Sequence, residues 1–120
     1  MSAARGRLRL EAVACRAGED LTVVLTGGET PHVGCVVVAR AHPATDDPRR
    51  TSVTSSVLAI PPHREEALAR PLAEALARAT GGTVVVAAGV HTDRLGKRGI
   101  AAYLAMGEVV LERLLQELGP

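Results

Sequence analysis

The chain has 120 residues and an almost even charge balance, with 14 lysines and arginines against 13 aspartates and glutamates. This length predicts a single domain, residues 1–120. The basic residues are scattered and Tyr103 is the only Phe, Tyr or Trp, which argues against a nucleic-acid partner. No apolar run reaches the roughly 20 residues of a membrane span, and residues 1–14 lack a secretory signal's apolar stretch, so we expect a cytoplasmic protein without a membrane partner.

The first half of the chain predicts four strands. Residues 7–15 alternate between apolar and polar side chains, and residues 20–26 follow after a turn at Gly18, so the two form a hairpin. Residues 33–41 contain three consecutive valines, which is typical of a central strand buried on both faces. Residues 51–60 are rich in Ser, Thr and Val and predict a fourth strand that ends at two prolines.

The second half predicts two helices separated by one strand. Leucines recur at helical spacing in residues 63–80 and again in residues 97–118, and residues 83–89 form a short Val and Ala run between glycines. The element order is therefore ββββαβα. Four strands before the first helix favour an α+β fold, with a mainly antiparallel five-stranded sheet and two helices on one face.

Three of the four histidines are expected at one edge of this sheet. If strands two, three and four are joined as hairpins, His32 and His63 lie where strands turn at the same edge. A helical crossover then brings the fifth strand to that edge, and His91 follows it. His42 is expected at the opposite edge.

Three converging imidazoles can hold a divalent metal such as zinc or iron, and we predict a metal site at His32, His63 and His91. Glu65 and Asp93 each follow a histidine by two residues and are the candidate carboxylate partners. Each has an equally good simpler interpretation: Glu65 as a charge favoured in the first turn of a helix, and Asp93 as the start of a turn.

A phosphate could bind at the same edge. His63 opens the first predicted helix, whose unpaired amides favour an anion, and Arg64 and Lys97 could add positive charge. Gly34 lies inside a predicted strand, where glycine costs stability unless a bulge or an abutting ligand requires it. We therefore count His32, Gly34, Arg64 and Lys97 as candidate cofactor-binding residues. Cys15 and Cys35 lack metal or redox spacing and are expected to be buried thiols.

Three motifs together resemble the prenylated-flavin chaperone family, whose best-known member is the small D subunit accompanying UbiD-type gallate decarboxylases. They are Thr30-Pro31-His32-Val33-Gly34, Pro61-Pro62-His63-Arg64-Glu65 and Gly89-Val90-His91-Thr92-Asp93. Their order and spacing match, and the pattern covers about residues 21–118. Two departures stand out: Pro62 replaces a glycine, and the last helix begins with Lys97-Arg98 where acidic residues are expected.

The resemblance implies a non-catalytic accessory that binds prenylated flavin mononucleotide (FMN). It would take the cofactor from a flavin prenyltransferase and help deliver it to a UbiD-type decarboxylase. The family histidines would map onto His32, His63 and His91, and their carboxylate companions onto Glu65 and Asp93.

Two other functions remain open from the residues alone. The first is a small metal-dependent hydrolase or lyase with Glu65 or Asp93 as general base. The second is a structural subunit of a larger enzyme, in which the histidines are incidental. For any of the three, the high apolar content and the broad apolar stripe of the last helix predict a homo-oligomer.

Overall fold

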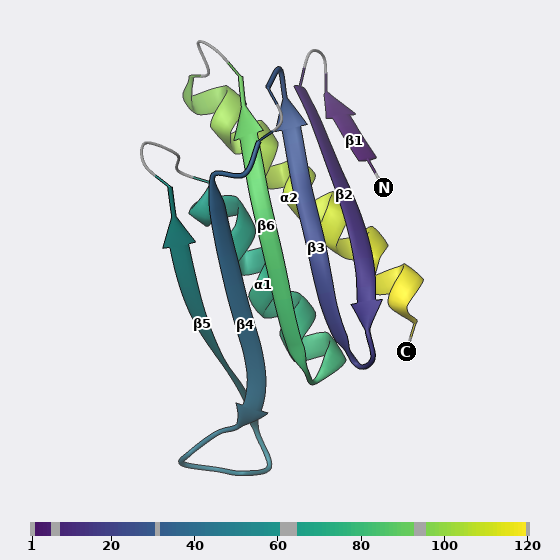
Figure 1. Cartoon of the computed structure of the whole chain (residues 1–120), viewed down its shortest axis with the longest axis vertical. Coiled ribbons are helices and arrows are strands. Elements are labelled where there is room, and N and C mark those ends of the chain that lie inside the picture. Colours follow the sequence, from purple (N-terminus) through teal and green to yellow (C-terminus); the bar gives the residue numbers. More distant parts are fainter. Residues whose placement is uncertain (1, 6–7, 31, 61–64, 93–95, 120) are drawn as a thin grey trace.

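The computed structural model describes residues 2–5, 8–30, 32–60, 65–92 and 96–119, with six strands and two helices among them (Figure 1). Each of the seven predicted elements is present, with shifts of a few residues at some ends. The elements are β1 (Ser2–Arg5), β2 (Leu8–Ala17), β3 (Asp20–Gly28), β4 (Cys35–Pro43), β5 (Thr51–Ala59), α1 (Glu66–Thr80), β6 (Thr83–His91) and α2 (Lys97–Leu118).

The predicted α+β class is confirmed, but the predicted five-stranded sheet and its order ββββαβα are wrong in two respects. A further strand, β1, precedes the others; its four residues, Ser-Ala-Ala-Arg, are too short to show an alternating pattern. The strands lie in the order β1-β2-β3-β6-β4-β5, so β6 separates β3 from β4, which do not form a hairpin. Among the described strands only β3 and β6 pair in parallel, which makes the sheet mixed.

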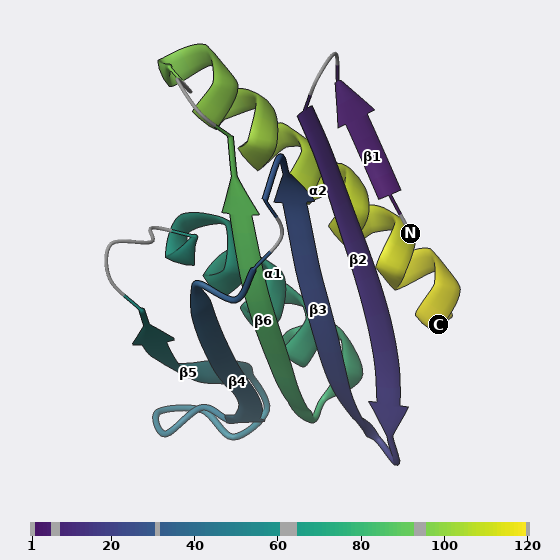
Figure 2. The same cartoon turned by 45° about the horizontal axis from the view of Figure 1, so that its top comes forward.

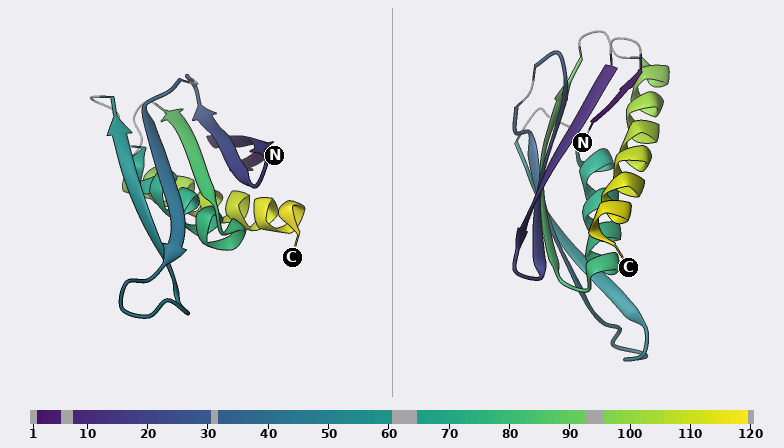
Figure 3. Two further views of the ribbon diagram at one scale, coloured as in Figure 1. Left: turned by 60° about the horizontal axis from the view of Figure 1, so that its bottom comes forward. Right: turned by 90° about the vertical axis from the view of Figure 1, so that its right-hand side faces the viewer.

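Both helices cover the same face of the sheet, as predicted (Figure 3, right). On β3, β4 and β6 every second residue points into this layer, and α1 and α2 add their apolar stripes. Gly107 lets the helices approach closely, because a Cβ atom there would lie 2.5 Å from Leu68 Cδ1. Neither helix in the described parts of the chain is long and apolar enough to cross a membrane. The largest fully buried side chains among the described residues are Leu10, Val23, Leu25, Cys35, Val37, Leu76, Val84, Val86 and Val110.

The other face of the sheet is open, and this corrects the prediction that the three-valine strand is buried on both faces. Val37 points into the core and is fully buried, but Val38 is 41% exposed on the open face. The three valines favour a strand because they are β-branched, and only one face of this strand is covered. Cys15 also lies exposed, contrary to the expected buried thiol, whereas Cys35 is buried as predicted.

Strand directions divide the ends of the sheet into two edges. At one edge β3, β5 and β6 end, β4 begins, and both helices start; we call it the histidine edge because His32 and His91 lie there (Figure 1). The prediction that His42 lies at the opposite edge is confirmed. It is the penultimate residue of β4, where Nε2 contacts Thr54 Oγ1 at 2.7 Å.

The connection from β3 to β4 crosses over the end of β6, because β6 lies between those strands (Figure 2). Two backbone hydrogen bonds hold the crossing chain: Glu29 N–H donates to the His91 carbonyl at 2.7 Å, and Gly34 N–H donates to the Ala88 carbonyl at 2.8 Å. At Gly89 a Cβ atom would lie only 1.6 Å from the His32 carbonyl oxygen. Only glycine at this position lets the crossing chain lie so close to β6.

We predict that Gly89→Ala destabilises the fold, because the new methyl group meets backbone and cannot be relieved by a rotamer change. Overpacking of this kind costs roughly 1–3 kcal/mol, so the unfolding free energy in urea should fall by at least about that amount. Gly96→Ala is the matched control, because a Cβ atom at Gly96 meets nothing within 4 Å. An equal loss of stability in both variants would contradict the close crossing.

Candidate functional site

The histidine edge brings together several of the residues predicted for the site. His32 and Glu65 are in direct contact, His91 ends β6, and Lys97 begins α2 at the same edge. Gly34 lies beside Glu65 at the start of β4. The remaining predicted residues, His63, Arg64 and Asp93, lie outside the described residues.

The His32 ring is held at both nitrogens. Nδ1 lies 2.8 Å from the Thr30 carbonyl oxygen, and a carbonyl can only accept, so Nδ1 carries a proton and donates it. Nε2 lies 2.9 Å from Glu65 Oε1. A carbonyl on one ring nitrogen is the arrangement that orients a metal-ligating histidine and leaves its other nitrogen as the ligand. Thr30, which sequence reasoning did not single out, therefore sets the direction of His32.

Glu65 is the carboxylate partner at this edge. It directly precedes α1, its side chain is only 6% exposed, and Oε1 also accepts a hydrogen bond from Val90 N–H at 3.3 Å. Because Nδ1 already donates to Thr30, one proton is shared between Nε2 and Oε1, and the contact is an ion pair when that proton lies on the imidazole. The pair joins the crossing loop, the start of α1 and the end of β6 at one point.

Gly34 provides the space for this carboxylate. A Cβ atom at Gly34 would lie 2.5 Å from Glu65 Oε2 and 2.8 Å from Cδ. The prediction that something abuts Gly34 is therefore explained by a side chain of this chain. Its backbone φ is not in the left-handed region, so close approach is the reason for glycine here.

Cys35 lies next to Gly34 and is completely buried. Burial raises the pKa of its thiol, and the negative charges of Glu65 and Glu66 raise it further. The thiol therefore stays protonated near neutral pH, which makes it a poor nucleophile and a poor metal ligand. The groups at this edge that could bind a ligand are therefore imidazoles and carboxylates, and not the Cys35 thiol.

Imidazole nitrogen and carboxylate oxygen are atoms that divalent metals accept as ligands, and His32 Nε2 and Glu65 Oε1 lie 2.9 Å apart at this edge. Within the described ranges, however, no group of three or more His, Cys, Asp or Glu side chains is arranged to hold a metal. Two of the five predicted ligands are thus brought together.

A buried hydroxyl pair lies beneath the end of β6. Thr92 Oγ1 and Tyr103 Oη are 2.6 Å apart, and both residues are buried. The single tyrosine is consequently part of the core and is not an exposed wall for a flavin ring. The pair connects the end of β6 with α2, and no spacing in the sequence indicates it.

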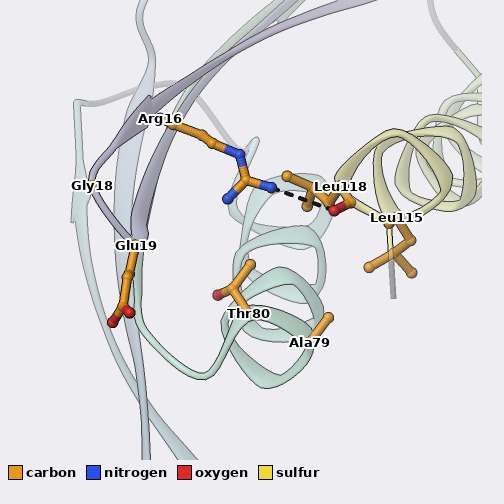
Figure 4. A pocket seen from close by; sticks show the side chains of 8 residues that line it. Arg16, Gly18, Glu19, Ala79, Thr80, Leu115 and Leu118 are labelled. Atoms are coloured by element: carbon orange, nitrogen blue, oxygen red, sulfur yellow. Dashed lines mark hydrogen bonds between the residues drawn. The ribbon is translucent and has the colours of Figure 1, made fainter.

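A separate cavity of about 340 Å³ lies at the opposite end of the molecule, between the β2–β3 turn and the ends of both helices (Figure 4). Arg16 crosses it and donates from Nη2 to the Leu118 carbonyl at 3.4 Å. None of the predicted site residues lines this cavity, which is bounded by Arg16, Gly18, Glu19, Ala79, Thr80, Leu115, Leu118 and Gly119.

Comparison with known proteins agrees with the resemblance of the three motifs. The model of a family described as the prenylated flavin chaperone LpdD-like domain matches residues 4–119. The chain belongs to this family. A curated relative, Protein LpdD of Lactiplantibacillus plantarum (strain ATCC BAA-793 / NCIMB 8826 / WCFS1), is 24% identical over 110 residues, which cover 92% of this chain and 77% of the relative. In this LpdD-like chain the described residues of the three motifs, with His32, Glu65 and His91 among them, lie at the histidine edge.

We predict a measurable coupling between His32 and Glu65. A double-mutant cycle with His32→Ala and Glu65→Gln should give an interaction free energy of about 1–3 kcal/mol at neutral pH, because the pair is largely shielded from solvent. Urea unfolding of the four proteins measures it. Additive effects of the two substitutions would contradict the ion pair.

We also predict different reactivity of the two cysteines. Near pH 8, a thiol reagent should modify exposed Cys15 rapidly and reach buried Cys35 only when the protein unfolds. Cys15→Ser should then remove the fast reaction and leave only the slow one. Two fast thiols in the folded wild type would show that Cys35 is accessible.

Proposed function

We propose that this chain is a non-catalytic carrier of prenylated FMN, which receives the cofactor from a flavin prenyltransferase and delivers it to a UbiD-type decarboxylase. The observation that carries the proposal is the fixed orientation of the His32 ring in a chain of the prenylated flavin chaperone family. Its Nδ1 is bound to the Thr30 carbonyl and its Nε2 faces Glu65. These contacts fix the orientation of the His32 ring at the edge where the described residues of the family motifs lie.

The metal in this proposal is a divalent cation, with iron as the first candidate. His32 and Glu65 would hold it, with His91, His63 and Asp93 as further ligands. A bound cation would supply positive charge that links a phosphate group to the protein. Gly34 leaves room for the Glu65 carboxylate beside His32, so both proposed donors already lie at this edge.

The phosphate fits the start of α2 better than the start of α1. Glu65 and Glu66 place negative charge at the first turn of α1, which disfavours an anion there. The first turn of α2 has no acidic residue, begins with Lys97 and follows Gly96, where a Cβ atom would meet open space. Its amides and Lys97 are therefore the proposed phosphate contacts, in place of the start of the first helix that the sequence predicted.

The ring system would pack on aliphatic side chains. Val33 is 49% exposed in the crossing loop, and Ile60 is 46% exposed directly after β5. The two segments adjoin, since Ile60 N–H donates to the Gly34 carbonyl at 2.8 Å. An aliphatic surface of this kind suits a carrier, which must release its cofactor to an enzyme.

The test is anaerobic titration of the iron-supplemented protein with reduced prenylated FMN, followed by equilibrium dialysis. We expect selective retention over plain FMN, and at least a tenfold loss of affinity in His32→Ala, the scale expected when the ligand sphere of a metal is disturbed. His42→Ala is the matched control, since His42 lies at the opposite edge, and should retain the cofactor. Retention of neither flavin, or equal weakening by both substitutions, would contradict the proposal.

The same preparations distinguish a carrier from a hydrolase. Cofactor-loaded protein should activate a decarboxylase that lacks its cofactor, and His32→Ala should abolish this transfer. Hydrolysis of phosphoesters or amides by the metal-loaded protein, lost in His32→Ala without any flavin retention, would instead support the hydrolase.

A further inference from the structure

The outer edge of β5 is long and uncharged. In the described part of the sheet β5 pairs with β4 alone and forms one border. Its nine residues, Thr-Ser-Val-Thr-Ser-Ser-Val-Leu-Ala, include no charge and no proline. Border strands in natural proteins are normally protected from further pairing by charges, prolines, bulges or short length. β5 has no charged residue and no proline, and it is as long as its neighbour β4.

The backbone groups that face outward can be identified from the hydrogen bonds on the inner side. Ile60 N–H donates to the Gly34 carbonyl on the β4 side, and alternate residues of a strand face the same way. Even-numbered residues of β5 therefore face β4. In agreement, the Thr51 carbonyl faces away from β4 and accepts from Arg78 Nη1 at 2.9 Å. The residues with outward N–H and C=O groups are Thr51, Val53, Ser55, Val57 and Ala59.

The sequence of this strand is nearly symmetric about Ser55. Residues 53–57 read Val-Thr-Ser-Ser-Val, so valines lie two positions away on either side and hydroxyl residues one position away. When two copies of one strand pair in antiparallel fashion about a two-fold axis, each residue meets the one equally far from the axis on the other copy. A charge near the axis would meet a like charge at close range, and β5 has none.

We propose that two copies of this chain pair through β5, antiparallel, about a two-fold axis at Ser55, and so join their sheets into one. Ser55 exchanges backbone hydrogen bonds with Ser55 of the second copy, and Val53 does so with Val57. The side chains of these valines pack against the core but are only half-buried. Their pairing covers apolar surface that one copy leaves exposed. This inference specifies the predicted homo-oligomer and does not depend on the flavin role.

The same register has a consequence for the histidine edge. It places Arg50 of the second copy opposite Ile60, the last described residue before the segment that holds His63. The loop between β4 and β5 extends beyond the rest of the sheet (Figure 1), so each copy's loop lies beside the other copy's histidine edge. Arg50 is paired with Asp46, and Arg49 with Asp47. The loop would therefore cover part of the other copy's histidine edge without bringing much net charge to it.

Cross-linking tests the register. In a Cys15→Ser background, which removes the exposed native thiol, Ser55→Cys should form a covalent dimer with the shortest phenylene bismaleimide, because Cα atoms of directly opposed residues lie about 5.5 Å apart. Ser52→Cys is the matched control, since six residues of strand, about 20 Å, separate it from its counterpart. Equal cross-linking of the two variants, or cross-linking of Ser52→Cys alone, would overturn the proposal.

Sedimentation equilibrium tests the hydrogen bonds at the axis. Ser55→Pro removes an outward N–H without removing a bond to β4, a position where a border strand tolerates proline. We expect the wild type and Ser55→Ala to be dimers at micromolar concentration, and Ser55→Pro to dissociate at least tenfold more readily with an unchanged circular dichroism spectrum. If Ser55→Pro loses its fold, the cross-linking pair decides alone. A monomeric wild type, or a folded Ser55→Pro as dimeric as Ser55→Ala, would refute β5 pairing.

Discussion

The position of β6 between β3 and β4 is the constraint from which the arrangement of the site follows. Two strands separated by a third cannot be joined by a tight turn, so residues 29–34 must cross the end of β6. The crossing is held by hydrogen bonds from Glu29 and Gly34 to β6, and it is possible at this distance because position 89 has no side chain. His32 lies on this crossing chain. Its place in the fold is therefore set by strand order and only indirectly by neighbouring residues in the sequence.

The His32–Glu65 pair completes the edge by tying the crossing loop to the start of α1. In the proposed function the same two atoms would bind a cation. Since a metal ligand must be deprotonated, cation binding would release the shared proton, and the hydrogen bond would preserve the site's shape when the metal is absent. Gly34 matters in both states, because it leaves room for the carboxylate of Glu65. The structural and the proposed functional roles of the pair thus support each other.

The two helix starts at this edge carry opposite charge. The start of α1 is acidic and the start of α2 is basic, so in the proposed site the first would favour a cation and the second a phosphate. Exposed Val33 and Ile60 offer apolar contact without enclosing a ligand, and the tyrosine that could have stacked on a ring is in the core. Pairing of two copies through β5 would add a neighbouring loop beside this open surface.

By itself, the sequence determined every helix and strand from β2 to α2, the α+β class, the coverage of one sheet face and the edge to which His32, His42 and His91 belong. Those properties depend on local periodicity and on the direction of each strand. The predicted direction of a strand can be correct even when its neighbours in the sheet are predicted wrongly. Tertiary structure alone decided that β6 separates β3 from β4, that β1 borders the sheet, and that Glu65 fills the space above Gly34. These features arise from contacts between segments distant in the chain, where register and close packing, and not periodicity, select the partner.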